Sequence, residues 1–90
     1  MIGMLAFSKA GHDKDILYVI VGEEKEFVYL SDGRLKSVES PKKKNKRHIQ
    51  IIKRVMDEDV AKRLQHGEPV RDEEIKKIIK DFLKQEVTNV

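Results

Sequence analysis

Apolar and polar residues follow one spacing in the first part of the chain and another in the second. Up to residue 54, apolar residues come in short runs that polar loops separate, whereas from residue 55 on they recur at helical intervals. Short apolar or alternating runs predict β-strands, and recurrence every three or four residues predicts amphipathic helices. The pattern therefore predicts five short strands in residues 1–54 and two helices in residues 55–90.

Three of the predicted strands are apolar segments of β-compatible composition, which are Met4–Ser8, Ile16–Gly22 and Arg47–Arg54. The second is β-branched and aromatic almost throughout, as is typical of a central strand with both faces covered. Five short strands with tight connections favour a small closed barrel, because closure removes the exposed strand edges.

The other two strands are predicted as a hairpin around Asp32-Gly33, a dipeptide that is a strong signal for a tight turn. Apolar residues alternate in Phe27–Leu30 before the turn, and Leu35–Glu39 continues beyond it as the fourth strand. Pro41 is expected to end this strand, because proline cannot donate a ladder hydrogen bond.

Both predicted helices have capping residues at their starts. Asp57 can cap the helix that begins at Glu58, and Gly67 can end it. Asp72 is a capping candidate for the second helix, whose apolar residues form one stripe. These residues are Ile75, Ile78, Ile79, Phe82 and Leu83. We expect the stripe to pack on the barrel, so that residues 1–54 form the barrel and residues 55–90 a two-helix extension packed on it.

Composition narrows the class of protein. The 90 residues include no cysteine, which excludes disulfides, thiolate metal sites and a cysteine nucleophile. The first residues lack the cationic lead and apolar length of a signal peptide, and no stretch approaches the roughly 20 apolar residues that cross a bilayer. We therefore expect a cytoplasmic protein with no membrane partner.

Charge is distributed unevenly along the chain. Residues 1–54 hold 12 lysine or arginine residues against 7 acidic ones, a net charge of +5, whereas residues 55–90 hold 7 against 9, a net charge of −2. Two segments of the basic part, Ser8–Lys14 and Ser40–Gln50, suit contacts to phosphates, which give affinity with little sequence discrimination. The candidate contact residues are Lys9, His12, Lys14, Lys42, Lys43, Lys44, Lys46, Arg47 and His48.

Three stretches resemble the KOW motif, a strand, a glycine-containing loop and a strand that occur in ribosomal and transcription-elongation proteins. The stretches are GMLAFSKAGHDKD, LYVIVG and SDGRLKSVESPKKKNKRHIQ. They are similar to a group of small bacterial KOW-domain RNA-binding proteins that resemble the archaeal and eukaryotic large-subunit ribosomal protein of the fourteen-e type. The resemblance covers residues 3–50 and is looser over the tail.

The resemblance implies a mainly β fold with added helices: a small SH3-like five-stranded barrel that binds RNA, followed by two C-terminal helices. The matched motif positions are Gly11, Asp13, Asp32, Gly33 and Pro41. Two positions depart from the family pattern. His12 stands where arginine is usual, which makes a permanent cation titratable. Asp15 stands where glycine is preferred, although aspartate tolerates left-handed backbone geometry better than most residues.

Other chemistry finds little support in the sequence. The three histidines lie far apart without paired ligand spacing, so we expect no metal site and no cofactor. No glycine-rich phosphate cradle, nucleophile elbow or metalloprotease motif occurs, so we expect neither enzyme activity nor a small-molecule substrate. Tyr18, Phe27 and Tyr29 are expected in the core, with Tyr29 the best candidate for stacking on a base.

The leading hypothesis is therefore a non-catalytic RNA-binding protein of the translation machinery, whose basic barrel rim contacts the phosphate backbone of ribosomal RNA. The alternative is a protein-interaction adaptor that docks on ribosomal or transcription proteins through the barrel or through Ile75, Ile79 and Phe82 of the final helix. RNA binding predicts affinity that falls steeply with salt, whereas docking through an apolar helix face predicts salt-tolerant binding.

Overall fold

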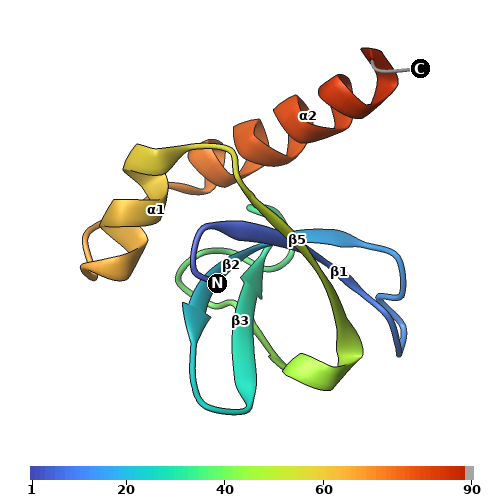
Figure 1. The fold of residues 1–90 in the computed structure, drawn as a ribbon. Helices are drawn as coiled ribbons and strands as arrows, with labels where there is room; N and C mark the ends of the chain where they lie inside the picture. The colour runs from blue at the N-terminus through green and yellow to red at the C-terminus, as the bar shows by residue number, and fades with distance from the viewer. Residues whose placement is uncertain (89–90) are drawn as a thin grey trace.

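The computed structural model describes residues 1–88, in which five strands precede two α-helices (Figure 1). The strands are β1 (Met4–Ser8), β2 (Leu17–Glu23), β3 (Phe27–Ser31), β4 (Lys42–Asn45) and β5 (Ile49–Val55), with a 3₁₀ turn, η1 (Lys46–His48), between the last two. The helices are α1 (Glu58–Gln65) and α2 (Asp72–Thr88). The predicted change from strands to helices is confirmed.

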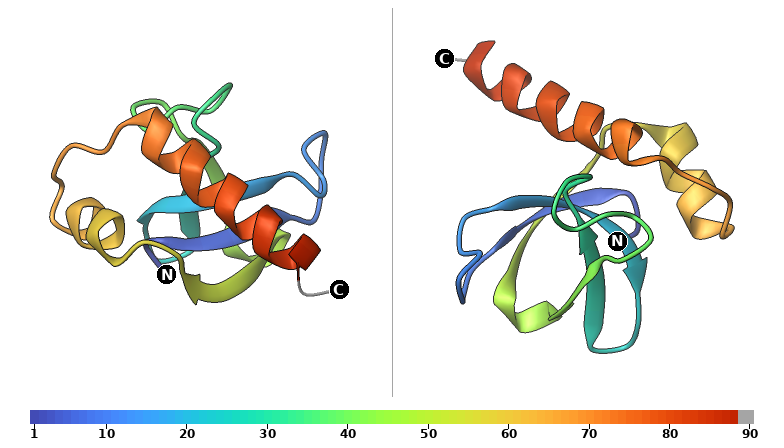
Figure 2. Two further views of the ribbon diagram at one scale, coloured as in Figure 1. Left: turned by 90° about the horizontal axis from the view of Figure 1, so that it is seen from above. Right: turned by 180° about the vertical axis from the view of Figure 1, so that it is seen from behind.

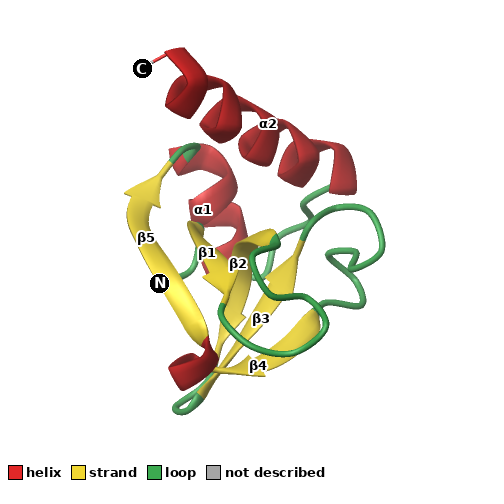
Figure 3. Cartoon of the chain, turned by 90° about the vertical axis from the view of Figure 1, so that its right-hand side faces the viewer, coloured by secondary structure: helices red, strands yellow, loops and turns green. Residues whose placement is uncertain are grey.

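The five strands form one antiparallel sheet in the order β4-β3-β2-β1-β5. The sheet is strongly curled (Figures 1 and 3), yet the described residues of β4 and β5 share no ladder. The predicted closed barrel is therefore wrong, because the sheet stays open between its two edge strands. β4 is only four residues long, and η1 redirects the chain before β4 can run beside β5.

The fourth strand lies later in the chain than predicted. Leu35–Glu39 is not a strand, because backbone amides in this region are bonded outside the sheet. The Asp32 carboxylate accepts hydrogen bonds from two of the amides that follow it, at 2.9 and 3.0 Å, and the Val38 amide donates to Asp72 at 2.8 Å. Pro41 thus precedes β4 instead of ending a strand, a place where its missing amide removes no ladder bond.

The two central strands are buried on both faces, as the composition of β2 predicted. On one face, Leu5 of β1 and Val19 of β2 pack with residues of both helices. On the other face, Ala6 and Tyr18 pack inside the curled sheet with residues of β3 and β5. All four side chains are at most 2% exposed. The sheet therefore has a helix-covered face and an interior face.

Helix α2 lies across the sheet with α1 to one side (Figure 2). Ile75, Ile78 and Phe82 are at most 5% exposed and belong to the core that the sheet shares with the helices. The predicted packing of the apolar stripe on the sheet is confirmed for these residues. Ile79 lies at the margin of this contact, and Leu83 is 48% exposed.

The capping residue predicted for the start of α1 is confirmed, whereas the one predicted for α2 makes a different contact. Asp57 caps α1 by accepting a hydrogen bond from a backbone amide of the first turn at 3.1 Å, and Gly67 follows its end with a φ of +70°. Asp72 is the first residue of α2, and its carboxylate accepts a hydrogen bond from the Val38 amide in the loop after β3. Arg63 of α1 holds Glu74 of α2 through two hydrogen bonds of 2.5 and 3.1 Å, which lower the pKa of Glu74 to about 2.

Gly33 lies where the loop after β3 meets the start of α2. Its φ is +72°, and an added Cβ would come within 2.5 Å of the Asp72 carbonyl oxygen. Gly67 has nearly the same φ, +70°, but a Cβ there would meet no atom within 4 Å. The two positions therefore differ in available space and hardly in backbone conformation.

We predict that Gly33→Ala lowers the free energy of unfolding by about 1 to 3 kcal/mol more than Gly67→Ala does. Both variants carry the penalty of a side chain at positive φ, about 1 kcal/mol, and only the first adds a backbone collision. Urea unfolding of both variants measures the difference. Equal losses would show that the loop does not press on α2.

Candidate nucleic-acid interface

The lysine run that the sequence predicted as a contact loop contains an edge strand. In β4, Lys42 and Lys44 stand opposite Leu30 and Val28 of β3, which are both fully buried. Directly opposed residues of an antiparallel pair share a face of the sheet. Lys42 and Lys44 therefore point into the interior of the curled sheet, and Lys43 points to its outer face.

Both inward lysines end on one carboxylate. Asp13, in the connection between β1 and β2, is 6% exposed, and Lys42 Nζ lies 2.7 Å from its Oδ2 while Lys44 Nζ lies 2.7 Å from its Oδ1. The Ser8 hydroxyl donates to Oδ1 at 2.9 Å, and the Tyr18 hydroxyl donates to Oδ2 at 3.3 Å. We call these five residues the Asp13 cluster.

The Asp13 cluster keeps its carboxylate ionised inside the protein. Burial alone would raise the pKa of Asp13, but hydrogen bonds from Lys42 and Lys44 outweigh burial and hold this pKa far below the ordinary value of 3.8. Burial, with the negative charge of Asp13 beside it, raises the pKa of Tyr18 to about 12, so its hydroxyl stays a donor. The cluster joins the β1–β2 connection to β4, two segments that share no ladder.

The other two lysines of the run are held more loosely. Lys46 Nζ lies 2.7 Å from an oxygen of Glu23. Lys43 Nζ lies 4.4 Å from the centre of the Phe27 ring and 4.0 Å from an oxygen of Glu24. Exposed pairs of this kind contribute less than about 1 kcal/mol, so a phosphate can replace the carboxylate. Lys44 is the most enclosed of the four, with a side chain 10% exposed, against 30% for Lys42, 25% for Lys46 and 50% for Lys43.

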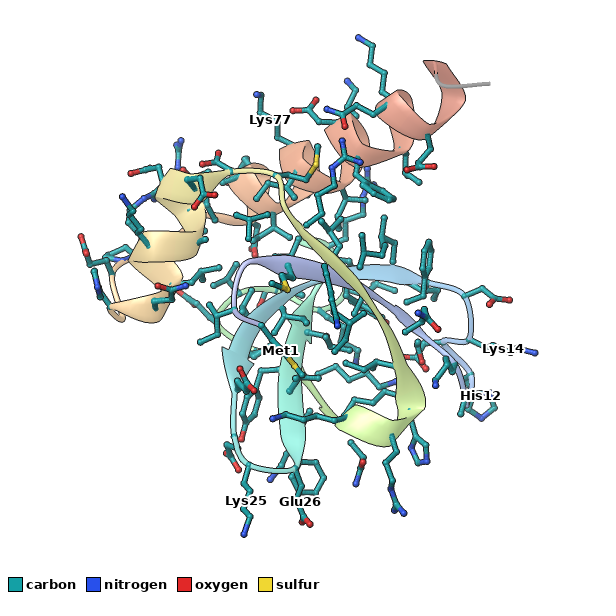
Figure 4. The ribbon with its side chains drawn as sticks, in the orientation of Figure 1. Met1, His12, Lys14, Lys25, Glu26 and Lys77 are labelled. Atoms are coloured by element: carbon teal, nitrogen blue, oxygen red, sulfur yellow. The ribbon has the colours of Figure 1, made fainter. Side chains whose placement is uncertain are left out.

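The β1–β2 connection presents Lys9, His12 and Lys14, which are all exposed. Figure 4 shows His12 and Lys14 at its tip, directed away from the sheet. Gly11 and Asp15 have φ values of +85° and +69°, so the tip turns twice through left-handed backbone. Asp15 thus adopts the conformation for which the family pattern has glycine.

Turn η1 brings two more basic residues beside this connection. The Asn45 side chain caps η1 by accepting a hydrogen bond from the Arg47 amide at 2.9 Å. The Lys9 amide donates to the His48 carbonyl oxygen at 2.8 Å, which ties the β1–β2 connection to η1. Arg47 and His48 are both exposed.

Lys25, at the tip of the β2–β3 turn, is a basic residue that sequence reasoning missed. Figure 4 shows Lys25 and Glu26 side by side at this tip. The Glu26 carbonyl oxygen accepts a hydrogen bond from the Lys46 amide at 2.9 Å, and Lys25 and Arg47 line one shallow hollow. In the sequence Lys25 stands among three glutamates, so its segment does not look basic. Its position near η1 depends on the register of β4, which no local sequence pattern predicts.

We call the exposed cations of these three segments, which backbone hydrogen bonds join at η1, the basic edge. Its members are Lys9, His12, Lys14, Lys25, Arg47 and His48. In the described part of the chain, none of the six makes an ion pair. Two exposed carboxylates without ion pairs, Asp15 and Glu26, lie on the same segments. With neutral histidines, four cations against two carboxylates leave the basic edge a net charge of +2.

The aromatic residues add little to this surface. Tyr18 is 2% exposed, as predicted for a core residue. The predicted stacking candidate, Tyr29, lies against Gly22, where an added Cβ would come within 3.2 Å of its ring. Lys43 covers Phe27. Both outer aromatic rings are therefore partly occupied by residues of the chain itself.

Comparison of the chain with models of known protein families gave no match, and no curated protein matched it either. Within residues 1–88, no helix combines the length and apolar character that crossing a membrane requires. The same residues contain no group of three or more side chains that could hold a metal ion.

Lys44 and Lys43 are adjacent in sequence and opposite in environment, which makes them a matched pair for mutation. We predict that Lys44→Met lowers the free energy of unfolding by about 2 to 4 kcal/mol, because it leaves a buried carboxylate with one cation fewer. Lys43→Met costs less than about 1 kcal/mol, since its pair and its ring contact are exposed. Denaturant unfolding of both variants measures the contrast, and a reversed order would contradict the assignment of faces in β4.

The depressed pKa of Asp13 makes part of the stability depend on pH. The folded state binds the Asp13 proton more weakly than the unfolded state, so this stabilisation is complete above the ordinary aspartate pKa of 3.8 and is lost as pH falls below it. We predict that the stability difference between the wild type and Asp13→Asn is large at pH 7 and shrinks steadily below about pH 4. Asp15→Asn, which removes an exposed carboxylate, is the control. If the stability loss of Asp13→Asn varied with pH in the same way as that of Asp15→Asn, the Asp13 cluster would not hold a buried carboxylate ionised.

Proposed function

We propose that the protein is a non-catalytic RNA-binding protein that holds the phosphate backbone of RNA with its basic edge. The observation that carries this proposal is a division among the cations. The six cations of the basic edge are exposed and, in the described part of the chain, make no ion pair, whereas Lys46, also in η1, is paired with Glu23 at 2.7 Å. Lys42 and Lys44, in contrast, are committed to Asp13 inside the sheet.

Phosphate contacts suit the basic edge better than base reading does. Its cations lie on the β1–β2 connection, the β2–β3 turn and η1. From there long side chains can reach successive phosphates along the backbone of a nucleic acid. The Arg47 guanidinium can donate two parallel hydrogen bonds to one phosphate, which a lysine cannot do. With the outer aromatic rings partly covered, selectivity comes from the shape of the RNA instead of from stacking on bases.

RNA is proposed, and not DNA, on the strength of the resemblance of residues 3–50 to the bacterial KOW-domain RNA-binding proteins. An SH3-like sheet and a place in the translation machinery, with ribosomal RNA as the target, belong to the same proposal. A curled five-stranded antiparallel sheet followed by helices is compatible with it. Lysine–phosphate contacts by themselves do not distinguish the two nucleic acids.

The adaptor hypothesis receives less support in the form in which the sequence suggested it. Two of its three docking residues, Ile75 and Phe82, are 0% and 5% exposed because they pack on the sheet. Only Ile79 remains partly accessible. A partner could therefore reach the final helix only through a different face.

Two charge-matched triple variants test the proposal. The edge variant is Lys9→Gln, Lys14→Gln and Arg47→Gln, and the control variant is Lys62→Gln, Arg71→Gln and Lys77→Gln, all at exposed positions. Affinity for structured ribosomal RNA fragments and for duplex DNA is measured from about 50 to 300 mM salt. Because each phosphate contact contributes about −0.7 to −0.9 to the log–log slope, the edge variant should flatten the slope by about 2 to 3 units.

The control variant should keep the wild-type slope, since it removes the same charge from the helices and the segment between them. Unfolding midpoints of the two variants should agree, which separates lost contacts from lost folding. Equal slopes for edge and control variants would contradict the proposal. Stronger binding to duplex DNA than to RNA would refute its choice of nucleic acid.

A further inference from the structure

A second basic surface lies against α2. A groove of about 680 Å³ runs between the loop after β3 and the outer side of the helix, and residues of both elements line it. The loop contributes Asp32 and Arg34, and α2 contributes Glu73, Lys76, Lys77, Ile79, Lys80 and Leu83. Figure 4 shows Lys77 at the opposite end of the molecule from Lys25 and Glu26, so the groove is separate from the tip of the β2–β3 turn.

Helix periodicity places two apolar residues in alternation with two lysines at this groove. Lys76, Ile79, Lys80 and Leu83 follow the spacing i, i+3, i+4 and i+7, which forms one stripe along α2. This stripe lies beside the core stripe that packs on the sheet. Leu83 is 48% exposed and Ile79 is partly buried. The groove therefore combines these two apolar side chains with long basic ones.

The charge of the groove is positive and largely unmatched. Among the described residues, Arg34, Lys76 and Lys80 make no ion pair with any carboxylate. Lys77 lies 3.4 Å from Asp81 of its own helix. The Asp32 carboxylate accepts hydrogen bonds from backbone amides of its own loop, so one of the two acidic groups is already engaged. An anionic group entering the groove would meet three available cations.

The groove is also held in one shape. The Val38 amide bonds Asp72 at 2.8 Å, and a Cβ on Gly33 would lie 3.0 Å from Lys76 Cγ, so the loop presses directly on the first turns of α2. Ile75 and Ile78, on the same helix, are anchored in the core. A preformed site loses little entropy when a ligand binds.

We propose that this groove binds an acidic, amphipathic peptide segment of a partner protein. Apolar side chains of the peptide would cover Ile79 and Leu83, and its carboxylates would contact Arg34, Lys76 and Lys80. An exposed leucine beside a partly covered isoleucine calls for an apolar partner, which a phosphate backbone does not supply. The surface differs from the helix face that the sequence suggested, and the proposal does not depend on RNA binding at the basic edge.

The test uses synthetic peptides of about fifteen residues and the whole chain labelled with ¹⁵N. One peptide carries leucines along one helical face and glutamates elsewhere, a second replaces the leucines by serine, and a third replaces the glutamates by lysine. The first should bind with a Kd of about 10 to 100 μM at about 100 mM salt, the range of transient contacts. Its binding should shift the amide signals of Arg34 and of the Lys76–Leu83 turns, while the other two peptides leave them unchanged.

Lys80→Glu with Leu83→Ser, both exposed positions, should weaken binding of the first peptide at least about tenfold. Lys62→Glu, on the exposed side of α1, is the matched control and should leave affinity unchanged. An unaltered NMR spectrum away from the substitutions shows that the variant is folded. Absence of shifts at the groove up to about 1 mM peptide, or equal affinity of variant and control, would overturn the proposal. Displacement of the peptide by ribosomal RNA would assign the groove to nucleic acid and would overturn it too.

Discussion

The contact of one buried carboxylate with two lysines supports the arrangement of the whole β-sheet region. Asp13 lies in a connection that no ladder joins to β4, and Lys42 and Lys44 bridge that gap at 2.7 Å each. A closed barrel would join its edges by backbone hydrogen bonds, which this sheet lacks between β4 and β5. Ionic contacts in the interior provide one connection across the open sheet. They are strong there because burial removes the competing water.

The same contact divides the basic residues into two groups, those paired with Asp13 and those exposed without an ion pair in the described part of the chain. Lys44, whose side chain is 10% exposed, would have to abandon a buried carboxylate before it could reach a phosphate. Such a step is costly, because an uncompensated buried charge destabilises a protein by several kcal/mol. By fixing the β1–β2 connection, however, these inward lysines give Lys9, His12 and Lys14 a defined place beside η1. The inward lysines can thus influence the proposed contacts of the basic edge without making any themselves.

Local sequence patterns predicted the elements whose formation depends on near neighbours. The β-branched run around Tyr18 predicted a strand covered on both faces, and the Asp57 cap with Gly67 predicted the limits of α1. Asp15 adopts a left-handed conformation, which aspartate tolerates better than most residues, where the motif that the segment resembles prefers glycine. In each case the deciding interactions lie within a few residues.

The errors concern features that distant residues decide. Leu35–Glu39 has the composition of a strand, but Asp72, more than thirty residues away, takes the Val38 amide. The sequence predicted the whole lysine run as phosphate contacts, and only the distant Asp13 shows that Lys42 and Lys44 are paired inside the sheet. Lys25 belongs to the basic edge only because β4 places η1, with Arg47, beside the β2–β3 turn. None of these pairings leaves a periodic signal in the sequence.

We propose that the inward lysines stabilise the fold and that the exposed ones bind RNA. NMR of the lysine ammonium groups, recorded on ¹⁵N-lysine protein before and after addition of a structured ribosomal RNA fragment, distinguishes the two groups. We expect slowly exchanging signals for Lys42 and Lys44 that RNA leaves unchanged, and signals of Lys9, Lys14 and Lys25 that RNA shifts. Shifts at Lys42 and Lys44 with none at Lys9 and Lys14 would contradict the proposal.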